Sequence, residues 1–185
     1  TSVASLYLEW NRISDLPDSF SEMVGLQSFY INNNILTSLG DNIGNLENLY
    51  FLDLGYNKLP SVPESICDLS NLTYLWLFSN NLETLPDCFC DLDLDWSNDD
   101  NAWYPYFGMG DNQVCENIPG CLESIDPSNC GSNISHFEMS LDQSYYAFHV
   151  YTPQDCDDVG IDSELFPYQF KVSAPYPNPF NPETN

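Results

Sequence analysis

The chain has 185 residues, 43% of them hydrophobic, which suits one domain with appendages and a buried core. Only 3 Lys and Arg residues stand against 28 Asp and Glu residues, which gives a formal net charge of -25. Because proteins neutralise phosphates with Lys and Arg, this balance argues against nucleic acid and anionic membrane surfaces as partners. No stretch approaches the roughly 20 apolar residues of a membrane helix, so the sequence predicts no membrane insertion.

An internal repeat of 23 residues begins at the N-terminus and continues to about residue 94. Asn marks the interval most clearly, at Asn11, Asn34, Asn57 and Asn80. Two apolar columns keep the same step, one with Leu6, Phe29, Leu52 and Leu75 and the next with Leu8, Ile31, Leu54 and Leu77. A proline column contains Pro17, Pro63 and Pro86 and is interrupted by Gly40. Self-similarity at a fixed period of this length predicts a solenoid.

The repeat LxxLxLxxNxLxxLPxxIxxLxx resembles the leucine-rich repeat family in its 23-residue form, over residues 3 to about 94. The resemblance implies an α/β solenoid, a horseshoe fragment with about five short parallel strands on its concave face. The residues agree, because the two leucines of LxL share one face of a strand. Apolar residues at steps of three after the proline suit 3-10 or short helical turns on the convex face. The Asn amide can both donate and accept, and a column of such amides can satisfy buried turns.

A fifth, degenerate repeat follows after an insertion. Residues 107–114 fit LxLxxNxL and place Asn112 in the Asn column. Asn112 follows Asn80 by 32 residues instead of 23, so about nine residues are inserted between Trp96 and Pro105. We therefore divide the chain into four repeats at 1–94, a fifth repeat with a Cys-rich cap at 95–130, and two further segments.

The sequence also predicts how the two ends of the repeat array are built. The chain enters in mid-repeat without a preceding cap, which predicts an N-terminal truncation and a first repeat that frays or exposes Leu6, Leu8 and Phe20. At the other end, clustered cysteines predict a disulfide-stapled cap and an oxidising compartment. We expect two bridges among Cys90, Cys115, Cys121 and Cys130. The choice is Cys90–Cys115 with Cys121–Cys130, although four cysteines allow three connectivities. Cys67 is interpreted as a small packed residue.

The C-terminal third does not repeat. Residues 131–170 are predicted to form a β-rich appendage with a hairpin of 136–141 and 145–151. Residues 171–185 form a Pro-rich linker. Its string YPNPFNP, Tyr176–Pro182, resembles the opening of the type A C-terminal sorting domain of the bacterial type IX secretion system. The resemblance implies a secreted or cell-surface bacterial protein that the secretion machinery recognises. An ordinary proline-rich linker is the alternative.

The concave face is the expected ligand site, since alternation along each strand turns the residues between the core leucines outward. Aromatic residues gather there on the third to fifth repeats. Contiguous exposed apolar surface marks interaction sites, and Tyr and Trp lead among binding hot spots. The predicted ligand-binding residues are Tyr30, Asn32, Phe51, Asp53, Tyr56, Tyr74, Trp76, Phe78 and Tyr106. In the alternative interpretation these rings pack on one another or on the insertion.

Other sites have weaker support. Asp91, Asp93 and Asp95 alternate as in a calcium loop, but Trp96 stands where an EF-hand loop needs Gly. No catalytic constellation or phosphate loop is visible, so we expect no enzyme activity, no cofactor and no metal. The sequence thus predicts a leucine-rich-repeat module for protein, peptide or glycan recognition. The alternative is a spacer or display arm between an upstream, possibly enzymatic domain and the sorting domain.

Overall fold

The computed structural model describes residues 3–96, 106–115, 118–123, 136–139, 144–147 and 154. Within 136–139 and 144–147 it describes the backbone alone. The predicted insertion, Cys130, most of the predicted appendage and the Pro-rich C-terminal motif lie outside these residues.

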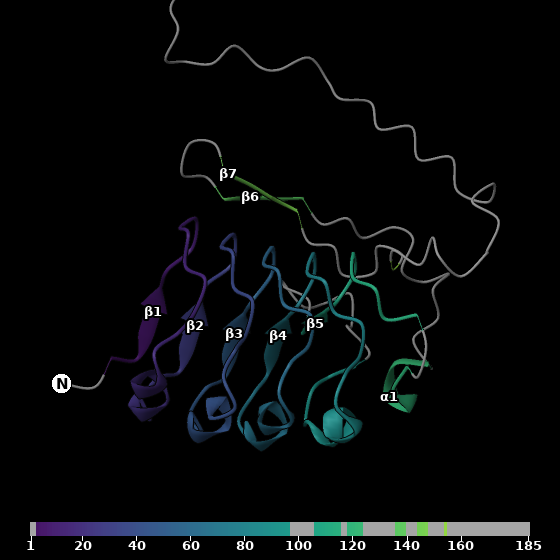
Figure 1. Ribbon diagram of the computed structural model, residues 1–185, viewed down its shortest axis with the longest axis horizontal. Helices are drawn as coiled ribbons and strands as arrows, with labels where there is room; N and C mark the ends of the chain where they lie inside the picture. Colours follow the sequence, from purple (N-terminus) through teal and green to yellow (C-terminus); the bar gives the residue numbers. More distant parts are fainter. Residues whose placement is uncertain are drawn as a thin grey trace, which may run out of the picture.

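Five short strands form one parallel sheet in chain order (Figure 1). They are β1 (Ser5–Tyr7), β2 (Ser28–Tyr30), β3 (Phe51–Asp53), β4 (Tyr74–Trp76) and β5 (Phe107–Gly108). Short helices follow the strands, namely the 3-10 helices η1 (Asp18–Glu22), η2 (Ile43–Asn45), η3 (Glu64–Asp68) and η4 (Asp87–Asp91), and then α1 (Gly120–Glu123). In Figure 1 the 3-10 helices lie in a second row, along one side of the strands. This architecture confirms the predicted solenoid.

Strand register follows the 23-residue period. Ser28 pairs with Phe51, and Phe51 pairs with Tyr74, each one repeat apart. Leu75 pairs with Phe107, so the inserted residues leave the fifth strand in register. Equivalent residues of successive repeats therefore become spatial neighbours, about 4.8 Å apart.

The core lies between the sheet and the 3-10 helices. Leu52 and Leu54 of the third repeat are fully buried, as are Leu26 and Leu49 from the segments that lead into the strands. Leu6 and Leu8 of the first repeat are only partly buried, in line with their expected exposure. For Phe20 that expectation is wrong, because its ring is buried and packs on Phe29 at a centroid distance of 4.6 Å.

Three of the four 3-10 helices begin directly after a proline with an extended backbone. Pro17, Pro63 and Pro86 precede η1, η3 and η4, and each carbonyl accepts the first backbone hydrogen bond of its helix. Proline suits this position because its φ is already near −65° and it needs no donor there. Gly40, which breaks the column, has a φ of +81° that proline cannot adopt.

The Asn column ties each repeat to the one before it. Asn57 Nδ2 lies 3.0 Å from the carbonyl of Leu54 in its own turn and 3.1 Å from that of Ile31 in the preceding repeat. Its Oδ1 accepts from the backbone N–H of Leu36 at 3.0 Å. Asn34, Asn80 and Asn112 repeat this arrangement, whereas Asn11 bonds only to its own turn. Backbone groups that the solenoid buries are thereby satisfied.

The disulfides differ from the expected pairing. Cys67 bonds to Cys88 and Cys90 bonds to Cys121, while Cys115 is also disulfide-bonded. The predicted Cys90–Cys115 and Cys121–Cys130 pairs are therefore wrong, as is the interpretation of Cys67 as a packed residue. The physical reason is register. Cys88 lies one 3-10 helix beyond Cys67 on η4, so stacking brings their Cα atoms to 6.1 Å, a distance that a disulfide spans.

Two further strands, β6 (His136–Met139) and β7 (Ser144–Ala147), pair antiparallel, which confirms the predicted hairpin. Among all the residues described, none belongs to a helix that is long and apolar enough to cross a membrane.

Candidate functional site

A row of stacked aromatic rings crosses the sheet on the face opposite the 3-10 helices, which we call the concave face. Successive ring centroids lie 4.8 Å apart from Tyr7 to Tyr30, 4.8 Å from Tyr30 to Phe51, 5.0 Å from Phe51 to Tyr74 and 5.1 Å from Tyr74 to Tyr106. These five residues, one from each repeat, form what we call the ring ladder. Its spacing is the strand spacing of the sheet.

The ring ladder changes column between β2 and β3. Tyr7 and Tyr30 stand between the two core residues of their strands, whereas Phe51 and Tyr74 stand before the first core residue. Asp53 occupies the Tyr30 column in the third repeat, so the next ring available to Tyr30 is Phe51. Strand alternation points both columns to the concave face, which keeps the row continuous.

A second aromatic cluster lies beside the ring ladder and is buried. Trp76 packs edge-on against Phe51 at 4.7 Å and lies 6.1 Å from Phe78. Only 4% of Trp76 and 0% of Phe78 is exposed, and Phe51 is buried too. The expectation that these rings present themselves to a ligand is therefore wrong. Rings on adjacent strands pack on one another, as the alternative interpretation held.

The exposed concave rings are mainly tyrosines. Tyr30, Tyr56, Tyr74 and Tyr106 are partly exposed, and Tyr7 is 64% exposed. Trp10, which follows β1, is 63% exposed. The sequence-based site omitted Tyr7 and Trp10 because it weighted the density of aromatic residues on repeats three to five. Their position in concave columns was the available signal.

Asn32 and Asp53, two of the predicted ligand-binding residues, belong to a buried hydrogen-bond network. Asn32 Nδ2 donates to Asp53 Oδ2 at 2.6 Å, and Asn33 Nδ2 donates to Asn32 Oδ1 at 2.7 Å. The backbone N–H of Gly55 donates to Asp53 Oδ1 at 3.1 Å. Only 1% of Asp53 is exposed, and Asn32 is buried as well. The Asn32–Asp53 hydrogen bond joins the second repeat to the third, and neither side chain presents a polar surface, which corrects their expected role in ligand binding.

Two concave tyrosines stay protonated over an extended pH range. Burial raises the pKa of Tyr30 to about 12, with a further contribution from the charge of Tyr7. Burial likewise raises the pKa of Tyr56 to about 12, against an opposing hydrogen bond to Ser79. Both phenols are therefore neutral hydrogen-bonding groups at physiological pH.

In every repeat, the residue before the Asn of the Asn column has a left-handed backbone conformation. Trp10, Asn33, Tyr56, Ser79 and Asp111 have φ between +53° and +60°. Non-glycine residues adopt this conformation at a cost of about 1–3 kcal/mol. The recurring turn places this column at the rim of the concave face, with Tyr56 packed edge-on against Phe78 at 5.5 Å.

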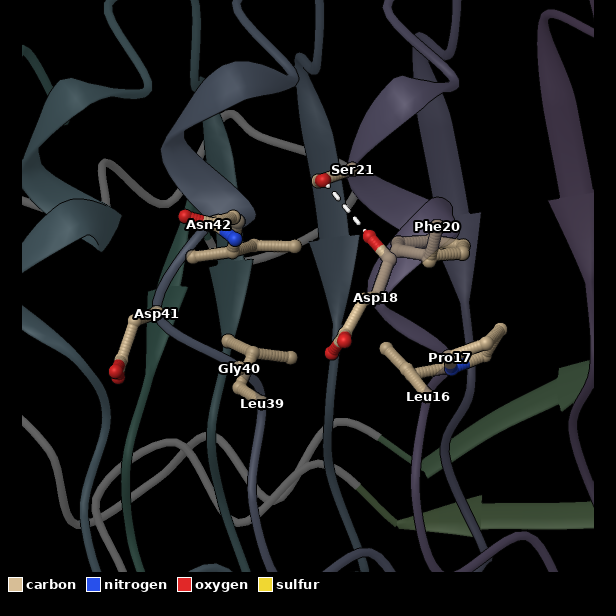
Figure 2. Close-up of a pocket in the computed structure, with 10 residues that line it drawn as sticks. Leu16, Pro17, Asp18, Phe20, Ser21, Leu39, Gly40, Asp41 and Asn42 are labelled. Atoms are coloured by element: carbon tan, nitrogen blue, oxygen red, sulfur yellow. Dashed lines mark hydrogen bonds between the residues drawn. The ribbon is translucent and has the colours of Figure 1, made fainter.

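A small hollow lies on the convex side. It lies between the first two repeats, at Leu16, Pro17 and Phe20 on one side and Leu39, Gly40 and Ile43 on the other (Figure 2). Asp18 and Asp41 stand at its margin. Its volume of about 50 Å³ is well below the roughly 300 Å³ at which ligand pockets begin. In the part of the chain that the structure describes, no three His, Cys, Asp or Glu residues are placed to hold a metal ion.

Comparisons with known proteins find leucine-rich repeats in the N-terminal part of the chain. A family model described as leucine rich repeat matches residues 1–59 and 24–82. A solved leucine-rich-repeat protein of Leptospira interrogans is 35% identical, with a TM-score of 0.47. The match covers 49% of this chain and 24% of that one, so the chain spans about a quarter of the length of that protein. No curated protein matches the sequence.

Proposed function

The chain carries leucine-rich repeats, and from that premise we propose that it is a recognition module that binds an extended segment of a partner protein along the ring ladder. Repeat solenoids offer extended concave surfaces to their partners. The proposal therefore concerns binding rather than catalysis, and it assigns the contact to the partly exposed tyrosines.

The continuous row of one ring per repeat, with neighbouring centroids about 5 Å apart, is the observation that carries this proposal. Each interior ring is held between two neighbours, and Phe51 is further supported by Trp76. Such rings lose little side-chain entropy when a ligand binds, because they are already ordered. Tyrosine presents apolar area together with a hydroxyl, which suits a peptide backbone as well as apolar side chains.

Ring stacking also favours a protein over a glycan. Sugars stack on the flat faces of aromatic rings, but in the ring ladder those faces contact the neighbouring rings. The ring planes of Tyr7 and Tyr30 are nearly parallel, with an interplanar angle of 3°, and those of Tyr74 and Tyr106 meet at 19°. The interior tyrosines therefore present only their ring edges and hydroxyl groups to a ligand. A glycan partner is accordingly the second candidate.

Selection from a displayed peptide library on the immobilised chain tests this function. Tyr30→Ser with Tyr74→Ser should weaken binding of the selected peptides by at least about tenfold, since two hot-spot rings are lost. Val24→Ser is the matched control, because Val24 is 57% exposed and belongs to none of the concave columns. Equal binding by the double variant and the control would contradict the proposal. Binding confined to a glycan array would favour the second candidate.

We further propose that the chain is exported. The Cys67–Cys88 and Cys90–Cys121 disulfides support this, since disulfides persist in oxidising compartments. The likeness of Tyr176–Pro182 to a type IX sorting domain supports a bacterial cell surface. A reporter fused to a type A sorting domain whose opening is replaced by Tyr176–Pro182 of this chain should be directed outside a bacterium that has this exporter. Retention inside the cell would contradict this route.

A further inference from the structure

We propose that Gln154 closes the repeat array, because its carboxamide occupies the position that the Asn of one further repeat would occupy. The fifth repeat thus ends in a binding site for a primary amide. The ligand of this site is a side chain from the non-repetitive part of the same chain. This closure concerns the end of the solenoid and goes beyond the recognition function proposed for the concave face.

Inside the array, each Asn of the Asn column binds two backbone groups of the preceding repeat. One is a carbonyl that accepts from the Asn Nδ2, and the other is the N–H five residues later, which donates to the Asn Oδ1. Asn112 makes both contacts, with the carbonyl of Leu77 at 3.0 Å and the N–H of Leu82 at 3.0 Å. Asn80 makes the equivalent contacts with the third repeat, at 3.0 and 3.1 Å.

In the fifth repeat the equivalent backbone groups are the carbonyl of Met109 and the N–H of Val114, and Gln154 binds both. Its Nε2 donates to the carbonyl of Met109 at 3.0 Å, and the N–H of Val114 donates to its Oε1 at 3.1 Å. The carbonyl of Met109 also accepts from Asn112 of its own turn, at 2.9 Å, as the equivalent carbonyl does inside the array. Gln154 therefore reproduces the inter-repeat contacts of an Asn column residue.

The two backbone groups restrict the side chains that fit this site. A carbonyl needs a donor and an N–H needs an acceptor, and here one side chain must supply both. A carboxamide has a donor and an acceptor on neighbouring atoms, whereas an ionised carboxylate only accepts and an ammonium group only donates. The additional methylene of Gln carries its amide further from the backbone than that of Asn, which suits a segment outside the repeat.

Closure of this kind satisfies a need that every solenoid end has. Terminal repeats require caps, because the groups that a following repeat would cover are otherwise left bare. Val114 is only 1% exposed, so its N–H needs a partner within the protein. Gln154 lies 45 positions after Met109, whereas Asn57 lies 26 positions after Ile31, so the repeat period does not predict the contact. The folded repeat module then extends to at least residue 154.

Hydrogen–deuterium exchange of the full chain tests this closure at a single backbone group. Gln154→Met keeps the length of the side chain and removes both hydrogen bonds. We expect the N–H of Val114 to exchange about tenfold faster in this variant, because it loses its acceptor. The N–H of Leu59, which donates to Asn80 in the interior of the array, should change much less. Gln27→Met is the matched control, since Gln27 is exposed on the second repeat, and it should leave the exchange of Val114 unchanged.

Unchanged exchange of the Val114 N–H in Gln154→Met would overturn the proposal, since the side chain would then act through its volume alone. Equal acceleration at Val114 and Leu59 would overturn it too, because the amide would then stabilise the whole fold instead of closing one end. Neither result involves a bound partner, so failure of the closure leaves the recognition function untouched.

Discussion

Phe78 lies against the backbone of Gly55 on the neighbouring repeat, so closely that a Cβ at residue 55 would overlap the ring, with Cδ2 and Cζ at 2.9 Å. This contact explains how a phenylalanine fits into the concave column that follows the second core leucine. Gly55 supplies the space, and Phe78 fills it completely, with 0% of its surface exposed.

Gly55→Ala should therefore lower the free energy of unfolding by about 1–3 kcal/mol, the usual cost of overpacking. Chemical denaturation measures it, and near-ultraviolet circular dichroism reports the displaced rings. Gly120→Ala is the matched control, because a Cβ there meets no atom within 4 Å. Equal stability of the two variants would contradict the packing described.

The Asn column predicts that replacing Asn with Ala lowers the free energy of unfolding by different amounts in different repeats. Asn57→Ala leaves the buried backbone N–H of Leu36 and the carbonyls of Ile31 and Leu54 without their partner. Each orphaned buried group costs about 1–3 kcal/mol, so we expect a loss of at least about 3 kcal/mol in unfolding free energy. Asn11→Ala, in an exposed turn where the amide donates only to the carbonyls of Leu8 and Glu9, should cost less than about 1 kcal/mol. Thermal denaturation of both variants measures the difference. Similar losses of stability in the two variants would contradict this role of the Asn column.

The Cys67–Cys88 disulfide predicts a stability gain from cross-linking consecutive repeats. The bridged residues are 21 positions apart. Replacing both with Ser should lower the unfolding free energy by about 3 kcal/mol, since the unfolded chain regains the closed loop's entropy. Chemical denaturation of the double variant, beside the parent protein under oxidising conditions, provides the measurement. An unchanged midpoint would show that the bridge constrains nothing.

Alkaline pH should destabilise the concave face. In the folded chain Tyr30 and Tyr56 have a pKa of about 12, against an ordinary value of 10.0. Between these values the unfolded chain has lost protons that the folded chain still holds, so stability falls as pH rises. Below pH 10 both tyrosines are protonated in the folded and in the unfolded chain, so their full contribution to the free energy of unfolding is present there. Denaturation midpoints across this range should fall less in Tyr30→Phe with Tyr56→Phe, and an identical fall would contradict the assignment.

The repeat period was sufficient to predict most of the fold. Asn11 to Asn80 at a constant step determine the strand register, and register then places the core leucines and the Asn column. The Cys67–Cys88 bridge was missed because Cys67 and Cys88 differ by 21 positions rather than by the 23 of the period, so they occupy different columns of the repeat.

The candidate site was less predictable, since alternation shows which face a side chain points to but not what covers it. Phe51, Trp76 and Asp53 all point to the concave face and are all buried. Their burial comes from the size and tilt of neighbouring rings and from the Asn32–Asp53 hydrogen bond. None of these properties can be predicted from the aligned sequences of the repeats. Tyr7, in the same column as Asp53 and Trp76, is exposed.

The central claim is that the tyrosines of the ring ladder are the recognition surface. Nuclear magnetic resonance of isotope-labelled tyrosine rings, titrated with a peptide selected on the chain, tests it most directly. We expect the ring signals of Tyr7, Tyr30, Tyr74 and Tyr106 to shift and saturate together with binding. Binding that leaves these signals in place while the backbone signals around Val24 and Asn48 shift would contradict the account.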